Sequence, residues 1–312
     1  MKREIVIGTR ESRLAMWQAR WVLERLQALY PHVCFTLRGI KTRGDRIQEV
    51  ALSKIGEKGL FTKELELALQ QREIDLAVHS MKDLPTSLPD GLAVGAICPR
   101  EHPGDVLVSR AGHTLEELPH AALIGTSSTR RAAQLRHYRP DLRVTPVRGN
   151  VTTRLRKLEE LGLDALVLAY AGLHRLGLDH LITQRIPYRI CLPAVGQGAI
   201  GIEVRAGDGE VLEMIRLLDD PPTRAAVTAE RSFLRELEGG CQVPVGALGE
   251  VKDGCLILEG MVATQDGSQL VRDKISGPVE QAESLGRELA ARLMARGAGE
   301  ILQKARQEFD QA

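Results

Sequence analysis

A short pattern that occurs twice constrains the fold of this chain more than any other feature. The sequence VIGT at residues 6–9 and the sequence LIGT at residues 123–126 each read as the end of an apolar strand, followed by a polar turn and a helix-like stretch. Two more strand-like segments, 75–80 and 164–170, each follow a helix-like stretch of their own. Because strands that alternate with helices build parallel sheets, the sequence predicts two similar α/β domains whose sheets are mainly parallel.

Two segments rich in breaker residues separate these units. Residues 97–105 and 191–201 contain prolines and glycines at turn-forming positions. They are typical of a chain that crosses from one domain to another and later returns. In α/β domains a ligand binds outside the carboxyl ends of the strands, so we expect a ligand-binding cleft between the two domains.

The pattern changes from about Pro222 onward. A helix-like stretch at 223–237 is followed by two strand-like segments, 245–251 and 255–264, and then by one long helix-like stretch at 279–309. These elements predict a small C-terminal α+β domain.

Positive charge is concentrated in one segment of a chain whose formal net charge is only +1. Residues 125–139 contain four arginines and no acidic residue, and the window to Lys157 contains eight arginines and one lysine against the single acid Asp141. This concentration predicts a local anionic partner. An aromatic content of 3% and the near-neutral total charge argue against nucleic acid as that partner.

The turn at Thr126, Ser127 and Ser128 is a candidate oxyanion site. Backbone N–H groups, hydroxyls and the positive end of a helix dipole would meet there, directly before Arg130 and Arg131. An ordinary N-cap with a solvated basic face is the alternative for the serine pair alone.

A second turn at a helix start favours the anion site. Arg148 and Arg154 flank the Gly-Asn turn at 149–150. A planar guanidinium pairs with one carboxylate at a time, so this many arginines predict a ligand that carries several carboxylates.

Asp83 follows Lys82 just after the strand-like segment 75–80. The two residues could form a structural ion pair, or Asp83 could cap the next turn. In a site that is otherwise cationic, a carboxylate stays ionised and usefully faces only an electron-poor group, such as a developing carbocation or a pyrrole N–H. His79 and His174 have no nucleophile-like neighbour in sequence, so we expect buried or hydrogen-bonded side chains for both.

The five cysteines are widely spaced and form no C-x-x-C pair. This spacing predicts reduced thiols and no metal site or disulfide framework. Cys241 follows two glycines on a loop, so the backbone could present its sulfur to something large; an inert small hydrophobic residue is the alternative. Cys34, Cys98 and Cys191 lie within or beside apolar strand-like runs.

Residues 54–69 begin with lysines and glycines ahead of a helix-like stretch. A surface loop with solvated lysines is one interpretation. The other is a mobile lid that closes Lys54, Lys58 and Phe61 over the ligand.

The N-terminus enters an apolar segment without a charged-then-apolar signal region, and nowhere are about eighteen consecutive residues apolar. We therefore expect a soluble, cytoplasmic protein that has no membrane partner.

Seven motifs are distributed from one end of the chain to the other. They are IGTRESRLA, GEKGLFTKELE, DLAVHSMKDLP, GTSSTRR, VRGNVTTRL, LPAVGQGAIGIE and LEGGCQVPVG. In this order and spacing they resemble the porphobilinogen deaminase family, whose members are also called hydroxymethylbilane synthases. No departure from the family's pattern falls at a position that we interpret as functional.

The resemblance implies a monomer with three domains. Domain 1 would comprise residues 1–98 and 199–218, domain 2 residues 103–193, and domain 3 residues 222–312. Domains 1 and 2 would resemble periplasmic binding proteins of type II, with the cleft between them, and domain 3 would carry the cysteine loop.

The resemblance also implies the chemistry. Such an enzyme joins four molecules of porphobilinogen head to tail, with release of ammonia, on a dipyrromethane cofactor that a thioether attaches to the loop cysteine, here Cys241. Asp83 would stabilise cationic pyrrole nitrogens and help to relay the proton. Hydrolysis would free hydroxymethylbilane, which passes to uroporphyrinogen-III synthase. By similarity, the residues that hold the acidic side chains of cofactor and substrate are Arg10, Ser12, Lys82, Thr126, Ser128, Arg130, Arg131, Arg148 and Arg154.

Two other functions stay open. A non-catalytic dicarboxylate-binding protein with a periplasmic-binding-protein fold would leave Asp83 and the Gly-Gly-Cys loop unexplained. A nucleic-acid-binding regulator would use the basic helix after Ser128 and would bind DNA in a salt-dependent way.

Overall fold

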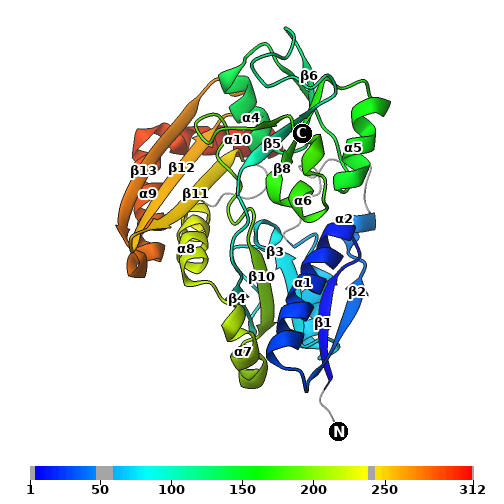
Figure 1. Cartoon of the computed structure of the whole chain (residues 1–312). Helices are drawn as coiled ribbons and strands as arrows, with labels where there is room; N and C mark the ends of the chain where they lie inside the picture. The colour runs from blue at the N-terminus through cyan, green and yellow to red at the C-terminus, as the bar shows by residue number, and fades with distance from the viewer. Residues whose placement is uncertain (1–3, 47–58, 238–242, 311–312) are drawn as a thin grey trace. The chain divides into compact units, whose positions relative to one another are not determined.

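The computed structural model describes residues 4–46, 59–237 and 243–310 (Figure 1). They form two compact units, which we describe separately. The first unit contains residues 4–46, 59–101 and 198–224, and the second contains residues 102–197, 225–237 and 243–310. Over these residues, no helix combines the length and the apolar character that crossing a membrane requires.

A five-stranded sheet with the order β2-β1-β3-β10-β4 forms the centre of the first unit. Strands β1, β2 and β3 are parallel, whereas β10 is antiparallel to its neighbours β3 and β4. The elements of this unit are β1 (Glu4–Arg10), α1 (Arg13–Leu29), β2 (Cys34–Ile40), α2 (Arg43–Arg46), α3 (Lys63–Gln70), β3 (Leu76–Ser80), β4 (Leu92–Ile97), β10 (Ile200–Arg205) and α7 (Gly209–Ile215).

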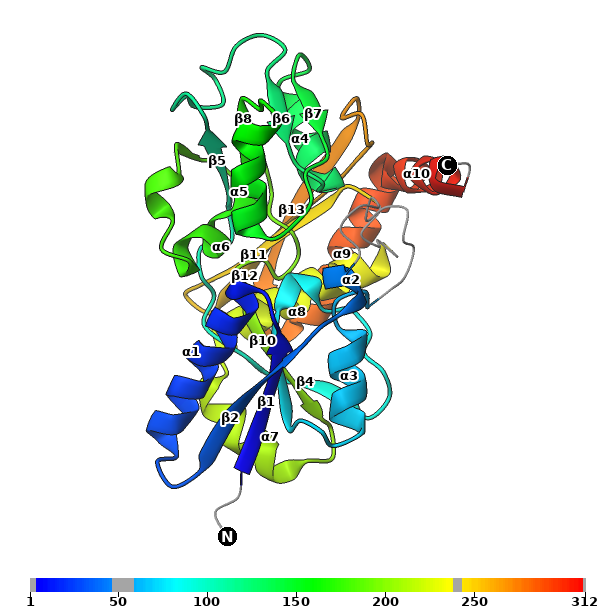
Figure 2. The ribbon, with the colours of Figure 1, turned by 90° about the vertical axis from the view of Figure 1, so that its right-hand side faces the viewer.

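Helices cover both faces of this sheet. On one face, Val22 and Leu26 of α1 pack in one cluster with Ile7 of β1. On the other face, Leu65 and Leu69 of α3 form a second cluster, and Figure 2 shows α1 and α3 on opposite sides of the strands. The alternation of buried residues along β1 and the helical spacing along α1 therefore build the layers that the sequence predicts.

The sheet of the second unit repeats the arrangement of the first. Its order is β7-β6-β8-β5-β9, with β6, β7 and β8 parallel and β5 antiparallel to both β8 and β9. In each sheet the antiparallel strand is the first strand after the chain passes from one unit to the other. The prediction of two similar, mainly parallel α/β units is confirmed, although it did not include the antiparallel strands. The elements here are β5 (Asp105–Ser109), β6 (Leu123–Gly125), α4 (Thr129–Tyr138), β7 (Arg143–Thr145), α5 (Val151–Glu160), β8 (Ala165–Ala169), α6 (Tyr170–Arg175) and β9 (Gln184–Arg185).

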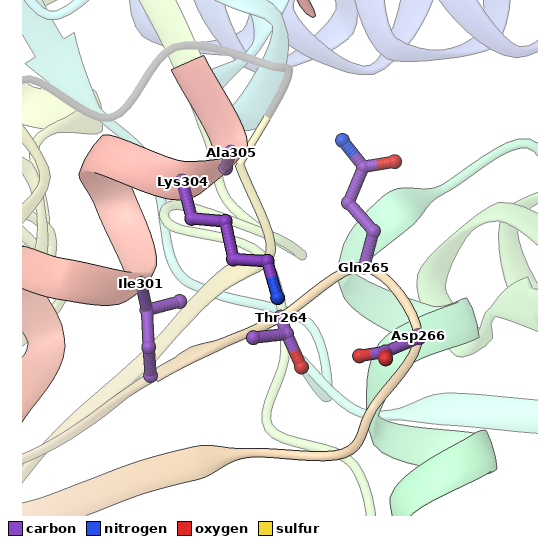
Figure 3. A pocket seen from close by; sticks show the side chains of 6 residues that line it. All are labelled: Thr264, Gln265, Asp266, Ile301, Lys304 and Ala305. Carbon is purple, nitrogen blue, oxygen red and sulfur yellow. The ribbon is translucent and has the colours of Figure 1, made fainter. Parts of the chain in front are cut away.

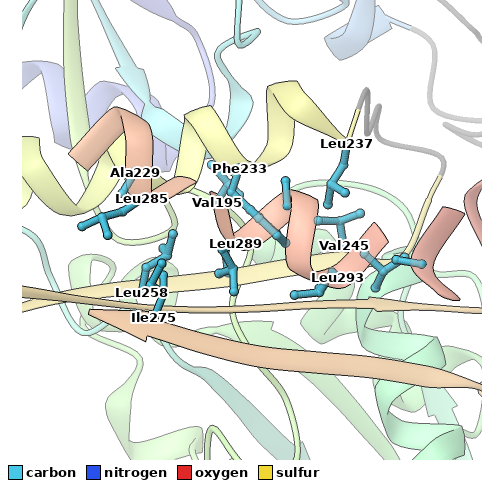
Figure 4. Packing of buried hydrophobic residues seen from close by; sticks show 14 of the residues in the cluster. Val195, Ala229, Phe233, Leu237, Val245, Leu258, Ile275, Leu285, Leu289 and Leu293 are labelled. Atoms are coloured by element: carbon cyan, nitrogen blue, oxygen red, sulfur yellow. The ribbon is translucent and has the colours of Figure 1, made fainter. Parts of the chain in front are cut away.

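The C-terminal part of the chain forms the predicted small α+β assembly. Three antiparallel strands, β11 (Val245–Lys252), β12 (Cys255–Ala263) and β13 (Leu270–Pro278), carry α8 (Pro221–Glu236) and α9 (Ala282–Leu293) on one face. Figure 4 shows Phe233 of α8 and Leu289 of α9 among the apolar side chains of this core. Strand β13 was not predicted, because most of its side chains are polar or only half-buried and give no apolar alternation.

The predicted single helix over residues 279–309 is wrong. Helix α9 ends before an irregular turn at 294–298, and α10 (Gly299–Asp310) begins after it. Within the turn, Gly297 has a φ of 101°, which lies in the left-handed region that glycine adopts readily. The apolar spacing continues through the turn, so the pattern alone does not show the break.

The turn between β12 and β13 packs against α4 within the second unit. Arg136 Nη1 donates to the Gln265 carbonyl at 3.0 Å, and His137 Nδ1 lies 2.9 Å from the Gly267 carbonyl. A Cβ at Gly267 would come within 2.5 Å of the Ala133 carbonyl, so only glycine allows this approach.

A pocket of about 120 Å³ lies beside this turn (Figure 3). It is lined by Thr264, Gln265, Asp266, Ile301, Lys304 and Ala305. No residue that the sequence predicts to be functional lines it.

Candidate functional site

The first candidate site lies at the edge of the first sheet, where β1 and β3 end. Strand β1 ends at Arg10, and Ser12 begins α1 by accepting a hydrogen bond from the Ala15 N–H at 3.3 Å. Strand β3 leads into a 3-10 turn (Met81–Asp83), which ends at Asp83. The structure brings Arg10, Ser12 and Asp83 together in the lining of a pocket of about 50 Å³.

Arg10 and Asp83 face each other in this pocket. Arg10 Nη1 lies 3.9 Å from Asp83 Oδ2, and the two side chains are 21% and 36% exposed. Water screens an ion pair of this kind strongly, so the contact orients both groups more than it stabilises the fold. Lys82, the neighbour of Asp83, is exposed.

Phe61 packs against Arg10. The guanidinium carbon lies 4.2 Å from the centre of the Phe61 ring, which is a cation–π distance. Phe61 also lies close to Gly44, where an added Cβ would collide with the ring. Phe61 also lines the pocket. The other two residues of the predicted lid, Lys54 and Lys58, lie outside the described residues.

The second candidate site is the turn between β6 and α4 in the second unit. The Thr126 hydroxyl accepts a hydrogen bond from the Ser128 N–H at 3.2 Å, and the Ser128 hydroxyl caps α4 by accepting from the Arg131 N–H at 3.4 Å. The hydroxyl of Ser127 is buried without a hydrogen-bond partner. Ser128 therefore acts as the N-cap of α4. The Ser127 hydroxyl takes no part in this cap.

Arg130 and Arg131 extend into the interior of the second unit. Arg130 Nη1 donates to Asp105 Oδ2 at 2.7 Å and to the Leu192 carbonyl at 2.6 Å. Arg131 donates through Nε and Nη2 to Asp105 Oδ1 at 3.0 and 2.7 Å, and through Nη1 to the Val167 carbonyl at 3.0 Å. Both arginine side chains are almost fully buried, and the side chain of Asp105 is 0% exposed.

Asp105 is therefore the countercharge of this pair. Burial alone would raise the pKa of its carboxyl, but the charges of Arg130 and Arg131 outweigh it and hold the pKa far below its ordinary range. Sequence reasoning missed Asp105; its only signal is an acid at the start of the apolar run DVLVS, directly after a breaker segment.

Part of the positive charge of the basic segment 125–139 is paired within the protein. Besides the pair on Asp105, Arg136 donates to a backbone carbonyl of the β12–β13 turn, and Arg139 forms a 2.6 Å ion pair with Asp141. Asp105 and Asp141 are thus partners of this charge within the protein, and the anionic ligand at this segment stays a prediction. A helix whose arginines point into the core also makes a poor DNA-binding surface.

Asp105→Asn should lower the free energy of unfolding by about 3–5 kcal/mol, because it leaves two buried guanidinium groups without a countercharge. Chemical denaturation at neutral pH measures this loss. The matched control is Glu160→Gln, which removes an exposed partner of Arg156 and should cost less than about 1 kcal/mol.

The pH dependence gives a second check on Asp105. Since folding lowers the pKa of this carboxyl, its stabilising contribution is present above the unfolded pKa of about 4 and is lost as the pH falls towards the folded value. The difference in stability between the wild type and Asp105→Asn should therefore shrink below about pH 4. Equal stabilities at neutral pH would contradict the assignment.

Arg148 and Arg154 surround the second helix start of this unit. Asn150 caps α5 by accepting from the Thr153 N–H at 2.9 Å, and Arg154 Nε donates to the Gly149 carbonyl at 2.8 Å. Arg148 Nη1 is buried and has no hydrogen-bond partner among the described residues, and burial lowers the pKa of this guanidinium. A buried cationic donor without a partner is costly, so Arg148 is well suited to receive an anion.

The described cysteines differ in their environments. Cys191 is fully buried, and its thiol lies 3.4 Å from Asp105 Oδ2; burial, followed by the Asp105 charge, raises its pKa to about 12. A thiol in this state is a poor nucleophile. Cys34 is exposed and Cys98 is buried, whereas the predicted anchor Cys241 lies outside the described residues.

In both α/β units, hydroxyls and cationic side chains gather where strands lead into helices. This arrangement defines an α/β protein that is suited to bind acidic small molecules. Comparison with known families makes this specific. Residues 5–213 match the family described as porphobilinogen deaminase, dipyromethane cofactor binding domain, and residues 224–295 match the porphobilinogen deaminase C-terminal domain. The chain belongs to the porphobilinogen deaminase family.

Curated relatives agree over nearly the whole length. The porphobilinogen deaminase of Desulforudis audaxviator is 65% identical over 306 residues, which cover 98% of this chain and 99% of that protein. The porphobilinogen deaminase of Pelotomaculum thermopropionicum is 64% identical over 308 residues, or 99% of each chain.

Two solved structures align with part of the chain at low sequence identity. A variant of the VFT2 domain of BvgS from Bordetella pertussis is 14% identical, with a TM-score of 0.42 over 68% of this chain and 83% of that chain. The probable amino-acid transporter binding protein YtmK from Bacillus subtilis is 10% identical, with a TM-score of 0.41 over 70% of this chain and 90% of that chain.

Membership in this family defines the activity. Porphobilinogen deaminases are transferases of tetrapyrrole biosynthesis that form hydroxymethylbilane, and their cofactor is a dipyrromethane. The alternative of a non-catalytic dicarboxylate-binding protein is not favoured, because the match to enzymes extends over both family domains and almost every residue.

Proposed function

We propose that this chain condenses four molecules of porphobilinogen head to tail on a covalently bound dipyrromethane, and that Asp83 is the catalytic carboxylate. Ammonia leaves at each condensation, and hydrolysis then gives hydroxymethylbilane. The observation that carries the proposal is the pocket at the ends of β1 and β3, where the Asp83 carboxyl lies 3.9 Å from Arg10 in a chain of this family.

Asp83 acts on the positive charge that develops during condensation. Its carboxyl oxygens accept hydrogen bonds from the pyrrole N–H of the reacting porphobilinogen and hold the proton that each condensation releases. Arg10, with Ser12 and Lys82, binds the acidic side chains of the substrate. Because Arg10 lies next to Asp83, it also keeps the carboxyl group oriented.

The residues of the second unit fit a polycarboxylate cofactor. Within the part of the chain that the structure describes, the buried Arg148 Nη1 and the buried Ser127 hydroxyl lack hydrogen-bond partners. Both lie beside helix starts, where backbone N–H groups also favour anions. The chemistry that the cofactor supplies when bound is a free pyrrole α-carbon, to which the first substrate unit is joined. We assign its carboxylates to the predicted set Thr126, Ser128, Arg130, Arg131, Arg148 and Arg154.

Within this set, Arg148 should contribute most to the binding of the cofactor. Arg130 and Arg131 already share the carboxylate of Asp105, so any ligand competes with or adds to that pairing. Arg148 has a buried donor with no competing partner.

Cys241 is the proposed point of attachment of the cofactor. The thioether needs a thiolate that can reach an electrophilic carbon once, during assembly of the holoenzyme. Cys191 does not meet this requirement, because it is fully buried and has a raised pKa of about 12.

Further assignments follow from the family resemblance. The protein acts as a monomer in the cytoplasm, and light scattering of the purified protein tests the monomer. Its product passes to uroporphyrinogen-III synthase.

The three domains have the boundaries predicted above, with the substrate cleft between domains 1 and 2. Lys54, Lys58 and Phe61 form a lid. The contact of Phe61 with Arg10 supports the part of Phe61 in this lid.

The overall reaction is tested by its stoichiometry. Purified protein incubated with porphobilinogen should release four molecules of ammonia for each molecule of hydroxymethylbilane, since each condensation expels one amine. Binding of porphobilinogen without ammonia release would instead support a non-catalytic binding protein.

A further inference from the structure

Three titratable side chains lie together in the interior of the first unit, next to the pocket that contains Asp83. His79 comes from β3, Glu203 from β10 and Glu66 from α3. The side chains of His79 and Glu203 are 3% and 0% exposed, and Glu66 is also buried. His79 lines the pocket together with Asp83, so this cluster connects the pocket with the interior of the sheet.

His79 and Glu203 face each other in the interior of the first unit. His79 Nε2 is 2.9 Å from Glu203 Oε2, and an N–H at this ring nitrogen is a donor that a carboxylate oxygen can accept from. The atoms are not aligned as a full hydrogen bond, and among residues 4–46, 59–237 and 243–310 neither Nε2 nor the two Glu203 oxygens have another hydrogen-bond partner. Because isolated buried polar groups are costly, the two residues depend on each other.

The protonation of Glu66 affects the net charge of this cluster. Burial, with a further contribution from the charge of Glu203, raises the pKa of Glu66. Glu66 therefore keeps its proton more readily than an exposed glutamate, and this reduces repulsion of a negative charge on Glu203. Lys63 of α3 also faces Glu66 and acts in the opposite direction on its pKa.

The end of β3 is held from both faces of the sheet. On the α1 side, Gln18 Nε2 donates to the Ser80 hydroxyl at 2.9 Å. On the α3 side, His79 meets Glu203. The Met81 N–H then donates to the Ala199 carbonyl at 3.0 Å, immediately before the turn that ends at Asp83.

We propose that His79 is a positioning residue for Asp83: its Nε2–H, which faces Glu203, fixes the end of β3, from which the turn bearing Asp83 projects. The inference rests on the catalytic role proposed for Asp83. A displacement of about 1 Å at a reacting group can cost a factor of about 100 in rate. Loss of the pair should therefore affect kcat more than KM.

The test compares His79→Phe with His79→Gln in the cofactor-loaded enzyme. Phenylalanine fills the space but gives Glu203 no donor, so kcat should fall about 10- to 100-fold while KM changes less than about threefold. Glutamine restores an N–H donor near the position of Nε2 and should return kcat to within about threefold of the wild type. The matched control is His174→Phe, which removes an exposed histidine 2.9 Å from Asp179 and should leave kcat unchanged.

Nitrogen NMR of the imidazole gives a readout that does not depend on turnover. In the wild type, His79 Nε2 should carry a proton, and its resonance should move in Glu203→Gln. This measurement also applies if His79→Phe does not fold.

The inference is overturned if folded His79→Phe retains the wild-type kcat, if His79→Gln is as impaired as His79→Phe, or if Nε2 carries no proton. These results are distinct from a failure of the proposed function, which would appear as undiminished turnover in an Asp83 variant.

Discussion

Asp83→Ala is expected to lower kcat by about three orders of magnitude in enzyme that is folded and carries its cofactor. At about 4 Å and an effective dielectric constant near 20, one charge pair is worth about 4 kcal/mol, and this energy corresponds to roughly a thousandfold in rate if it acts only in the transition state. Asp83 lines the pocket, and its 36% exposure leaves its carboxyl group accessible to a substrate. Rapid-quench measurement of a single condensation would report the loss directly.

Two variants make this prediction specific. Asp83→Asn keeps the shape of the side chain but removes the charge, so it should be impaired nearly as much as Asp83→Ala. Asp90→Ala removes an exposed carboxylate outside the pocket lining and should leave kcat unchanged. A cofactor-loaded Asp83→Ala enzyme within about tenfold of the wild type would show that the carboxylate is not catalytic.

The layers of the fold could be predicted where the apolar pattern is local. The repeated strand and turn at residues 6–9 and 123–126 correspond to the ends of β1 and β6, and the segments 75–80 and 164–170 contain β3 and β8. Most residues of β3 and β8 are buried, and each of these strands contains a short apolar run. Strand direction could not be predicted, because whether β5 and β10 run antiparallel depends on how the chain crosses between the units.

The two errors in the C-terminal part have local causes. Strand β13 carries polar side chains that pair across the sheet, such as Arg272 with Glu259 at 2.7 Å, and therefore lacks an apolar face in sequence. The break before α10 depends on the backbone conformation of Gly297, which leaves the helical spacing of the apolar residues intact.

The charge pattern of residues 125–139 includes only some of the charges that surround these arginines. A count within residues 125–139 cannot include Asp105, which precedes the segment in sequence but lies between Arg130 and Arg131 in the structure. The contact of His79 with Glu203 could not be predicted either, because these two residues lie far apart in the sequence. Burial of His79 was correctly expected, but its partner required the pairing of β3 with β10.

The chemical environment of each cysteine determines whether its thiol can anchor the cofactor. A thiol forms a thioether with an electrophilic carbon only as its thiolate and only where that carbon can reach it. Cys191 fails on both grounds, since its surroundings raise its pKa to about 12 and exclude solvent. Cys34 is exposed, but it begins an apolar strand and has no adjacent glycines. The glycines that precede Cys241 are the feature that favours it.

Cys241→Ser is therefore expected to abolish turnover, because we expect no other thiol of the chain to replace Cys241 as the anchor. The loss should be complete and not partial, since the growing chain would have no covalent attachment. Cys34→Ser and Cys191→Ser should both retain the cofactor, and Cys34→Ser should also retain full activity.

Intact-mass spectrometry of the purified protein tests the central claim most directly. The wild type should be heavier than its sequence by the mass of two pyrrole units, Cys241→Ser should have the mass of its sequence alone, and Cys191→Ser should keep the increment. An increment that persists in Cys241→Ser, or one that disappears only in Cys191→Ser, would contradict the account.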